Sequence, residues 1–186
     1  TYGTVAAGDD IRYLLTGEMD GASVYAGFDA GPDGVFGTDD DVINGFNGEL
    51  QDFRIRPRPD VVGGSGDVID TWIITTGRIA STNLPSGGAG IMSGVFFSAG
   101  FGPGADDLYG TPDDLDDVLR SANIGNIGTS SRRFEHIDGW FQATRNVLDL
   151  NSSGDIGVLG DMIIAGRDVD DIRAGGTLWA DVYALD

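Results

Sequence analysis

The apolar positions of the chain come in short pieces that Gly or Asp residues separate. The first three are AAG at 6–8, IRYLLTG at 11–17 and SVYAG at 23–27. Apolar pieces of this length, bounded by turn formers, are typical of short strands joined by sharp corners and leave little room for helices. Similar pieces recur: LQDFRI at 50–55, DTWIITTGRI at 70–79, MSGVFFSAG at 92–100, ANIGNIG at 122–128 and DIGVLGDMIIAG at 155–166. The pattern predicts an all-β protein.

Two internal repeats organise these pieces. AGFDAGPDGVFGTDDD at 26–41 aligns with AGFGPGADDLYGTPDD at 99–114, at a constant offset of 73 residues. The two ends of the chain also match, because 7–26 aligns with 165–184 at an offset of 158 residues. A one-residue slip near Met19 and Leu178 is the only interruption of the second match.

A strand and corner unit that repeats every 20 to 25 residues or so cannot bury its inward side chains alone, whereas stacked copies share one continuous core. The sequence therefore predicts a parallel β-helix, or solenoid, formed by a single domain over 1–186 with loop insertions near 28–41 and 101–117. A β-sandwich or jelly roll is the alternative, since it also has many short strands. Continuous apolar pieces such as VFF and MII favour the β-helix, because they are typical of strands buried on both faces.

The composition of the chain narrows the classes of binding partner. The 186 residues have a formal net charge of -19, with 27 Asp against 3 Glu, no Lys and no Cys. Nucleic acid and anionic membrane surfaces are unfavourable partners for such a chain, whereas cations are favourable ones. A stabilising metal site must use oxygen ligands, which is the chemistry of Ca²⁺. No stretch reaches the roughly 18 apolar residues of a membrane span. The first residues lack signal-peptide features and there is no initial Met, so we expect a processed or excised segment.

The first repeated loop approximates a twelve-residue calcium loop from Asp29 to Asp40. Position 5 is Asp33, position 7 offers the Val35 carbonyl, and a Gly stands at the sharp turn. Gly31 at position 3 and Asp rather than Glu at position 12 depart from the EF-hand, and a solvated acidic turn is the alternative. The candidate calcium ligands here are Asp29, Asp33, Val35, Asp39, Asp40 and Asp41.

The second loop offers a less complete set. Asp106, Leu108 and Asp113 align with ligand positions, but Gly102 stands at position 1 and Asp107 replaces the turn Gly. The candidate ligands are Asp106, Asp107, Leu108, Asp113 and Asp114. A third candidate, DLNSSGDIGVLGD at 149–161, has dockerin-like spacing only at its start.

These loops and the IxxIxxxG-like pieces together resemble the Gly/Asp-rich calcium-binding β-solenoid repeats of large secreted bacterial surface proteins. The resemblance implies an extracellular or cell-surface, calcium-loaded, β-rich module. A structural or adhesive role is the function we expect from it.

An enzyme is the weaker interpretation. Polysaccharide lyases and glycosidases also use β-helices, and RRFEHIDGWF at 132–141 combines His136, Asp138 and Trp140, but no motif has a spacing specific to one reaction. We expect no catalytic residues and no cofactor besides Ca²⁺. A carbohydrate-binding or polysaccharide-cleaving β-helix protein is the alternative function, for which Trp72, Trp140 and Trp179 could supply a platform.

The matching ends predict a further partner. A solenoid without atypical end repeats leaves unpaired backbone groups at both ends. We therefore expect this chain to associate head to tail with other copies into a filament or array. A segment cut from a longer solenoid would have the same two open ends.

Overall fold

The computed structural model describes residues 3–36, 41–43, 48–56, 66–83, 90–102, 118–119, 121–129 and 132–185. Within these ranges every regular element is a β-strand, which confirms the all-β prediction. None of the described residues forms a helix long and apolar enough to cross a membrane.

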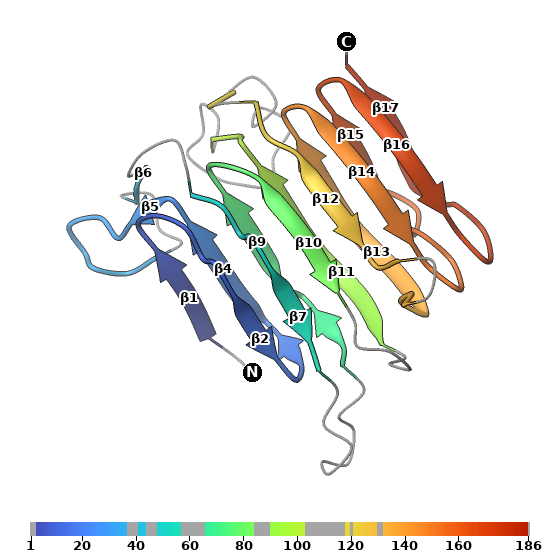
Figure 1. Cartoon of the computed structure of the whole chain (residues 1–186), viewed down its shortest axis with the longest axis horizontal. Coiled ribbons are helices and arrows are strands. Elements are labelled where there is room, and N and C mark those ends of the chain that lie inside the picture. The colour runs from blue at the N-terminus through green and yellow to red at the C-terminus, as the bar shows by residue number, and fades with distance from the viewer. Residues whose placement is uncertain are drawn as a thin grey trace.

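Two parallel sheets form the body of the molecule (Figure 1). Sheet A consists of β1 (Gly3–Ala7), β3 (Met19–Asp20), β4 (Ala22–Ala26), β8 (Val68–Ile69), β9 (Trp72–Thr75), β11 (Ile91–Ala99), β13 (His136–Ala143), β15 (Met162–Ala165) and β17 (Asp181–Ala184). Sheet B consists of β2 (Leu14–Thr16), β7 (Phe53–Ile55), β10 (Ile79–Asn83), β12 (Ile124–Ile127), β14 (Asn146–Asn151) and β16 (Asp168–Arg173). A separate ribbon pairs β5 (Phe28–Asp29) with β6 (Val42–Ile43).

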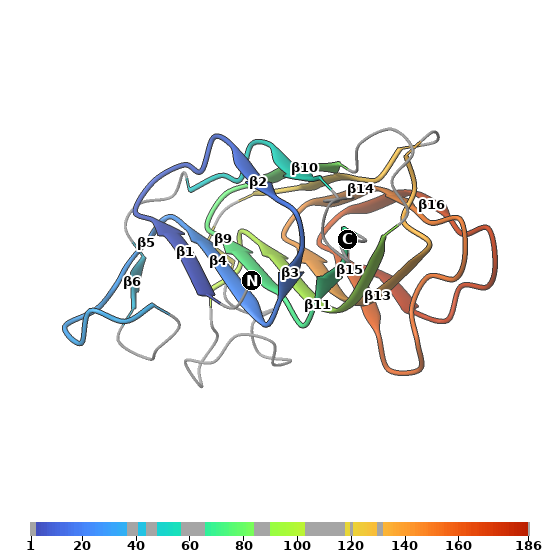
Figure 2. The ribbon, with the colours of Figure 1, turned by 90° about the horizontal axis from the view of Figure 1, so that it is seen from below.

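The chain alternates between the two sheets as it advances. From β1 it passes to β2 in sheet B, returns to β3 and β4 in sheet A, and repeats this passage until β17. We call one such passage from sheet A through sheet B and back a round. The strands follow in chain order along the molecule, with blue at one end and red at the other (Figure 1). Figure 2 shows the two sheets as facing layers, with the β5–β6 ribbon to one side.

All pairings within sheets A and B are parallel. Antiparallel pairing among the described residues is confined to β5–β6 and two isolated bridges. A sandwich or jelly roll requires antiparallel sheets, so the described sheets do not match that alternative. Each sheet is open, ending at β1 and β17 in sheet A and at β2 and β16 in sheet B.

The core lies between the sheets and consists of rows of residues that the strand register places side by side. The row in sheet A contains Val5, Val24, Ile73, Phe97, Phe141, Ile163 and Val182. Two rows in sheet B contain Ile11, Leu50, Ile79, Ile124, Val147 and Val169, and Leu14, Phe53, Thr82, Ile127, Leu150 and Ile172. These rows explain the spacing of three between apolar positions in pieces such as ANIGNIG.

The 158-residue repeat is a structural repeat. Ala7 pairs with Ala26 at the start of sheet A, and Ala165 pairs with Ala184 at its other end. The one-residue slip in the sequence match is also present in the structure. Met19 and Leu178 are one residue further apart than the offset of the repeat, yet they lie in one row through Val68, Met92, Ile137 and Ile156. The first and last rounds therefore have the same arrangement.

Candidate functional site

Both inserted loops leave sheet A from the same row of residues. Ala26 ends β4 and Ala99 ends β11, and both register with Thr75 of β9. Phe28 and Phe101 follow two residues later, and both are buried. At the base of the loops Phe28 pairs antiparallel with Ile43, and Phe101 bridges antiparallel to Val118. The 73-residue repeat therefore corresponds to two rounds of the chain with equivalent loop bases.

The first loop holds some of the predicted calcium ligands within its described part. Asp29 is exposed at the end of β5, and Asp33 and Val35 are exposed further along the loop. The Asp33 carboxylate accepts a hydrogen bond from the Val35 N–H at 2.7 Å, which forms a local turn rather than a ligand cage. Among the described residues no group of three or more His, Asp or Glu side chains is placed to hold a metal ion.

Among the remaining predicted ligands, only Asp41 lies within the described residues, where it is partly buried. Asp39 and Asp40 of the first loop lie outside the described residues, and so do Asp106, Asp107, Leu108, Asp113 and Asp114 of the second. The described part of the first loop does not assemble a calcium site by itself. Calcium binding stays a prediction for both loops.

The base of the first loop packs on the outer face of sheet A. Phe28 and Phe36 lie against Tyr25, with ring centroids 5.8 Å and 6.3 Å away. Burial raises the pKa of Tyr25 above its ordinary value of 10.0; a hydrogen bond with Ser23 opposes this rise, and the negative charge of Asp41 adds to it. The Tyr25 hydroxyl is therefore held protonated by the folded structure.

This pKa shift predicts a loss of stability at alkaline pH. The unfolded chain releases the Tyr25 proton more readily than the folded chain, so the stabilising contribution is complete below pH 10 and falls as pH rises through the folded pKa. Urea unfolding midpoints measured between pH 8.5 and 11.5 are expected to fall less steeply for Tyr25→Phe than for the unmodified chain. Equal slopes would contradict the assignment, and Tyr183→Phe, at an exposed position of β17, is the matched control.

Aspartate carboxylates connect neighbouring rounds at several corners. Five of them accept a hydrogen bond from a backbone N–H that belongs to the round before or after. The pairs are Asp10 with Glu49 at 3.0 Å, Asp67 with Ile91 at 2.9 Å, Asp138 with Gly94 at 2.5 Å, Asp155 with Thr177 at 2.7 Å and Asp161 with Gly139 at 3.0 Å. A short carboxylate suits this role, because its oxygens stay close to the backbone of its own corner. Part of the excess of Asp over Glu thus serves the joints between rounds.

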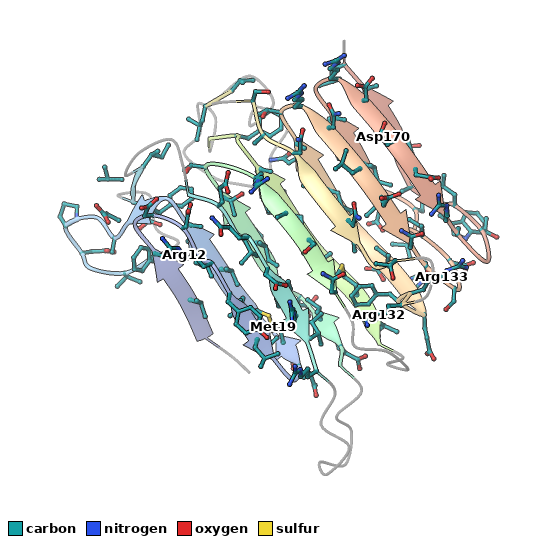
Figure 3. The ribbon with its side chains drawn as sticks, in the orientation of Figure 1. Arg12, Met19, Arg132, Arg133 and Asp170 are labelled. Carbon is teal, nitrogen blue, oxygen red and sulfur yellow. The ribbon has the colours of Figure 1, made fainter. Side chains whose placement is uncertain are left out.

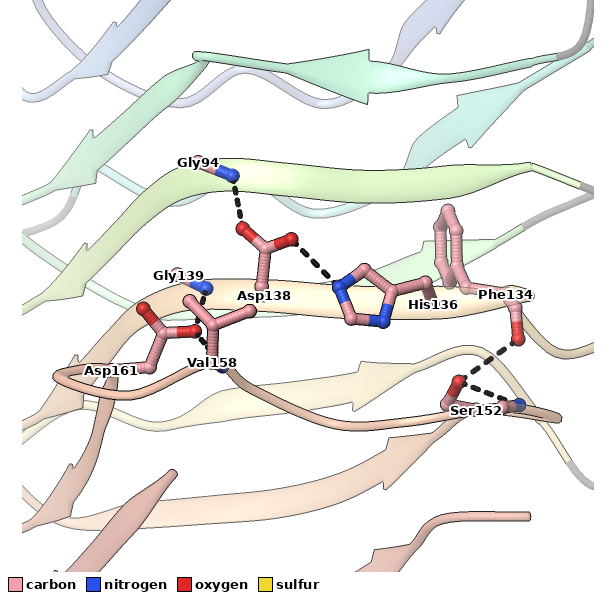
Figure 4. Close-up of polar contacts among 9 residues, drawn as sticks. Gly94, Phe134, His136, Asp138, Gly139, Ser152, Val158 and Asp161 are labelled. Carbon is pink, nitrogen blue, oxygen red and sulfur yellow. Dashed lines mark hydrogen bonds and ion pairs between the residues drawn. The ribbon is translucent and has the colours of Figure 1, made fainter. Parts of the chain in front are cut away.

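The RRFEHIDGWF segment contributes one of these joints. His136, Asp138 and Trp140 are alternate residues of β13, so their side chains lie on one face of the strand. His136 Nε2 lies 2.8 Å from Asp138 Oδ2, while Asp138 Oδ1 accepts the Gly94 N–H (Figure 4). Each oxygen of Asp138 therefore has a partner within the protein. This geometry supports a structural role for the pair.

Removal of the Asp138 carboxylate is expected to destabilise the fold. Asp138→Ala removes the hydrogen bonds to the Gly94 N–H and to His136 Nε2, which together contribute on the order of 1 to 3 kcal/mol to the free energy of unfolding. Asp149→Ala is the matched control, because Asp149 lies on β14 and no bond of its carboxylate is found in the described part of the chain. Urea unfolding followed by circular dichroism measures both, and equal midpoints for the two variants would contradict the role of Asp138.

The three tryptophans do not form one platform. Trp72 and Trp140 flank Phe96 at centroid distances of 5.1 Å and 6.0 Å, with interplanar angles of 56° and 88°. Trp179 lies in the last round, where its backbone N–H donates to the Ile156 carbonyl. A flat sugar-stacking surface needs rings that share a plane, and these do not.

Sequence reasoning missed the joints between rounds. They pair residues 22 to 44 positions apart, which no local motif reveals. The interpretation of VFF as a piece buried on both faces is confirmed, because Phe96 and Phe97 are both buried on opposite faces of β11. On the outer face of sheet A, Phe96 belongs to a second apolar cluster with Tyr25, Phe28 and Ile74.

Comparison with known proteins adds no further assignment. No protein-family model, curated protein sequence or solved structure matches this chain.

Proposed function

We propose that this chain is an extracellular structural or adhesive module, built as a parallel β-helix, stabilised by Ca²⁺ in its inserted loops and able to associate end to end with other copies. The equivalence of its first and last rounds is the observation that carries this proposal. Ala7 and Ala165 precede equivalent corners that begin with Gly, and Val24, Tyr25 and Ala26 are repeated as Val182, Tyr183 and Ala184.

The partly open core and the exposed edge strands at the two ends of the molecule support association. The core is partly open there: Ile11 and Leu14 at one end, and Val169 and Ile172 at the other, are only partly buried. Edge strands offer unpaired N–H and C=O groups to another strand. β17 is exposed along its whole length and β1 over its first three residues, so both edges are accessible.

The two loops support a role for calcium. Both are rich in Asp and Gly, leave the same row of sheet A, and have equivalent bases at Phe28 and Phe101. Clustered carboxylates repel one another without a cation, and a divalent ion relieves that repulsion.

Calcium removal is the prediction that tests this part. A chelator is expected to lower the melting temperature by about 5 to 10 °C, since occupation at 100-fold over Kd adds about 2.7 kcal/mol. A double variant with Asp29→Asn and Asp40→Asn should have a melting temperature lowered by part of that amount. Its melting temperature should also fall less when chelator is added. An unchanged melting temperature in chelator would refute the calcium assignment, and Asp149→Asn is the control for lost charge alone.

Association is tested on the unmodified chain. Sedimentation velocity over a hundredfold range of concentration, in calcium, is expected to show species that grow with concentration, and electron microscopy to show linear particles. A strict monomer at the highest concentration would overturn the end-to-end proposal.

A further inference from the structure

We infer that the partner of the last round is the first round of a second copy, held in one register by an ion pair between Asp170 and Arg12 of that copy. This inference rests on the proposed end-to-end association and adds its register and its specificity. β17 would lie parallel to β1 of the second copy, and β16 parallel to β2.

The register follows from the rows of the core. In sheet A the row that begins at Val5 ends at Val182, and the row that begins at Ala7 ends at Ala184. Continuing each row into a second copy places Val182 beside its Val5 and Ala184 beside its Ala7. A shift of one residue would turn the inward side chains outward and is therefore disfavoured.

Sheet B gives the same register independently. The rows that begin at Ile11 and Leu14 end at Val169 and Ile172. These side chains lie against the core at both ends and are only partly buried. Exposed apolar side chains also gather at the two ends. The exposed residues there are Val5, Tyr13 and Leu15 at one end and Leu178, Trp179, Val182, Tyr183 and Leu185 at the other.

Opposite charges at the two ends favour pairing of the last round with the first round of a second copy. Arg12 follows Ile11 and Asp170 follows Val169, so the register that joins Ile11 to Val169 also places these opposite charges side by side. The two side chains lie at opposite ends of the molecule (Figure 3). Both are exposed, and neither has an ion-pair partner within the described residues. Arg167 would likewise lie beside Asp9 of the second copy.

One like-charged pair shares this register, and each of its carboxylates already has a partner within its own molecule. Asp168 would lie beside Asp10 of the second copy. The Asp10 carboxylate accepts hydrogen bonds from the Glu49 N–H and from Gln51 Nε2 at 2.9 Å, within its own molecule. Asp168 pairs with Arg167 at 3.2 Å. The contact between Asp170 and Arg12 therefore decides the electrostatic balance.

A charge exchange tests the inference. Arg12→Asp places Asp at both ends, and Asp170→Arg places Arg at both ends, so each variant alone should associate about three- to tenfold more weakly than the unmodified chain. An equimolar mixture of the two should recover association, because every contact then joins opposite charges. The double variant should associate with itself as the unmodified chain does, and should co-assemble with the unmodified chain about three- to tenfold more weakly. Asn126→Arg and Asn126→Asp, at an exposed position of β12 in the middle of sheet B, are the controls for altered net charge.

Cysteine cross-linking tests the register directly, because the chain has no Cys. Ala6 and Tyr183 occupy one outward row of sheet A. Ala6→Cys with Tyr183→Cys should form a ladder of disulfide-linked copies, whereas Thr4→Cys with Tyr183→Cys, two residues out of register, should form far less.

The outcomes separate the two proposals. Absence of association in the unmodified chain would overturn both the end-to-end function and this register. Association of the unmodified chain without recovery in the mixture, or with equal cross-linking of both cysteine pairs, would overturn the register alone.

Discussion

Replacement of Phe97 by alanine is expected to cost about 3 to 5 kcal/mol of the free energy of unfolding. Phe97 lies in the central part of β11, fully buried, with the ring of Phe141 at a centroid distance of 5.3 Å. Its neighbours in the row, Ile73 and Phe141, belong to the rounds on either side. The loss therefore opens a cavity between two rounds rather than within one.

The size of this effect matters because a domain has only about 5 to 15 kcal/mol of stability in total. Urea unfolding measures it, with Phe97→Leu as an intermediate variant and Leu159→Ala as the control. Leu159 is 97% exposed, so its truncation should change stability by less than about 0.5 kcal/mol. A loss below about 1 kcal/mol for Phe97→Ala would show that the rows are not the packed core described here.

Substitution of Gly125 by alanine should be at least as damaging. Gly125 lies in β12, and a Cβ there would stand 1.6 Å from the carbonyl oxygen of Ala80 on the neighbouring β10. The obstructing atoms belong to the backbone, so no change of side-chain rotamer relieves the clash. We expect Gly125→Ala to unfold at a much lower urea concentration than the unmodified chain, or to fail to fold.

Gly34→Ala is the matched control for this variant. Gly34 has a φ of 70° but nothing within 4 Å of an added Cβ, so it tests backbone strain without a clash. That strain costs about 1 to 2 kcal/mol. Circular dichroism and urea unfolding compare the two variants, and equal midpoints would contradict the close approach of β10 and β12.

The sequence predicted those parts of the fold that depend on local pattern. Short pieces such as SVYAG became strands, and pieces spaced like Ile124 and Ile127 became rows of the core. The match between Ala7 and Ala165 predicted the equivalence of the end rounds, because insertions lie between the ends and not within them.

The candidate site could not be predicted in the same way, because it depends on contacts between rounds. An Asp in a Gly-rich corner can ligate a cation, face solvent or accept an amide from the next round, and its sequence neighbours are alike in all three cases. Asp161 is the last residue of the segment 149–161, the third candidate calcium loop. In the structure its carboxylate accepts the Val158 N–H at 2.7 Å and the Gly139 N–H at 3.0 Å.

The two loops leave sheet A at a corner where the chain can be lengthened without disturbing the stacked strands. Gly48 packs directly on Gly27, and the Leu119 N–H donates to the Gly100 carbonyl at 2.9 Å, so each loop returns beside the point where it left. At Thr76–Arg78 the equivalent corner joins β9 to β10 without any such excursion. Peptides of different length and chemistry could therefore be exchanged or displayed at these corners while the stacking beneath them stays unaltered.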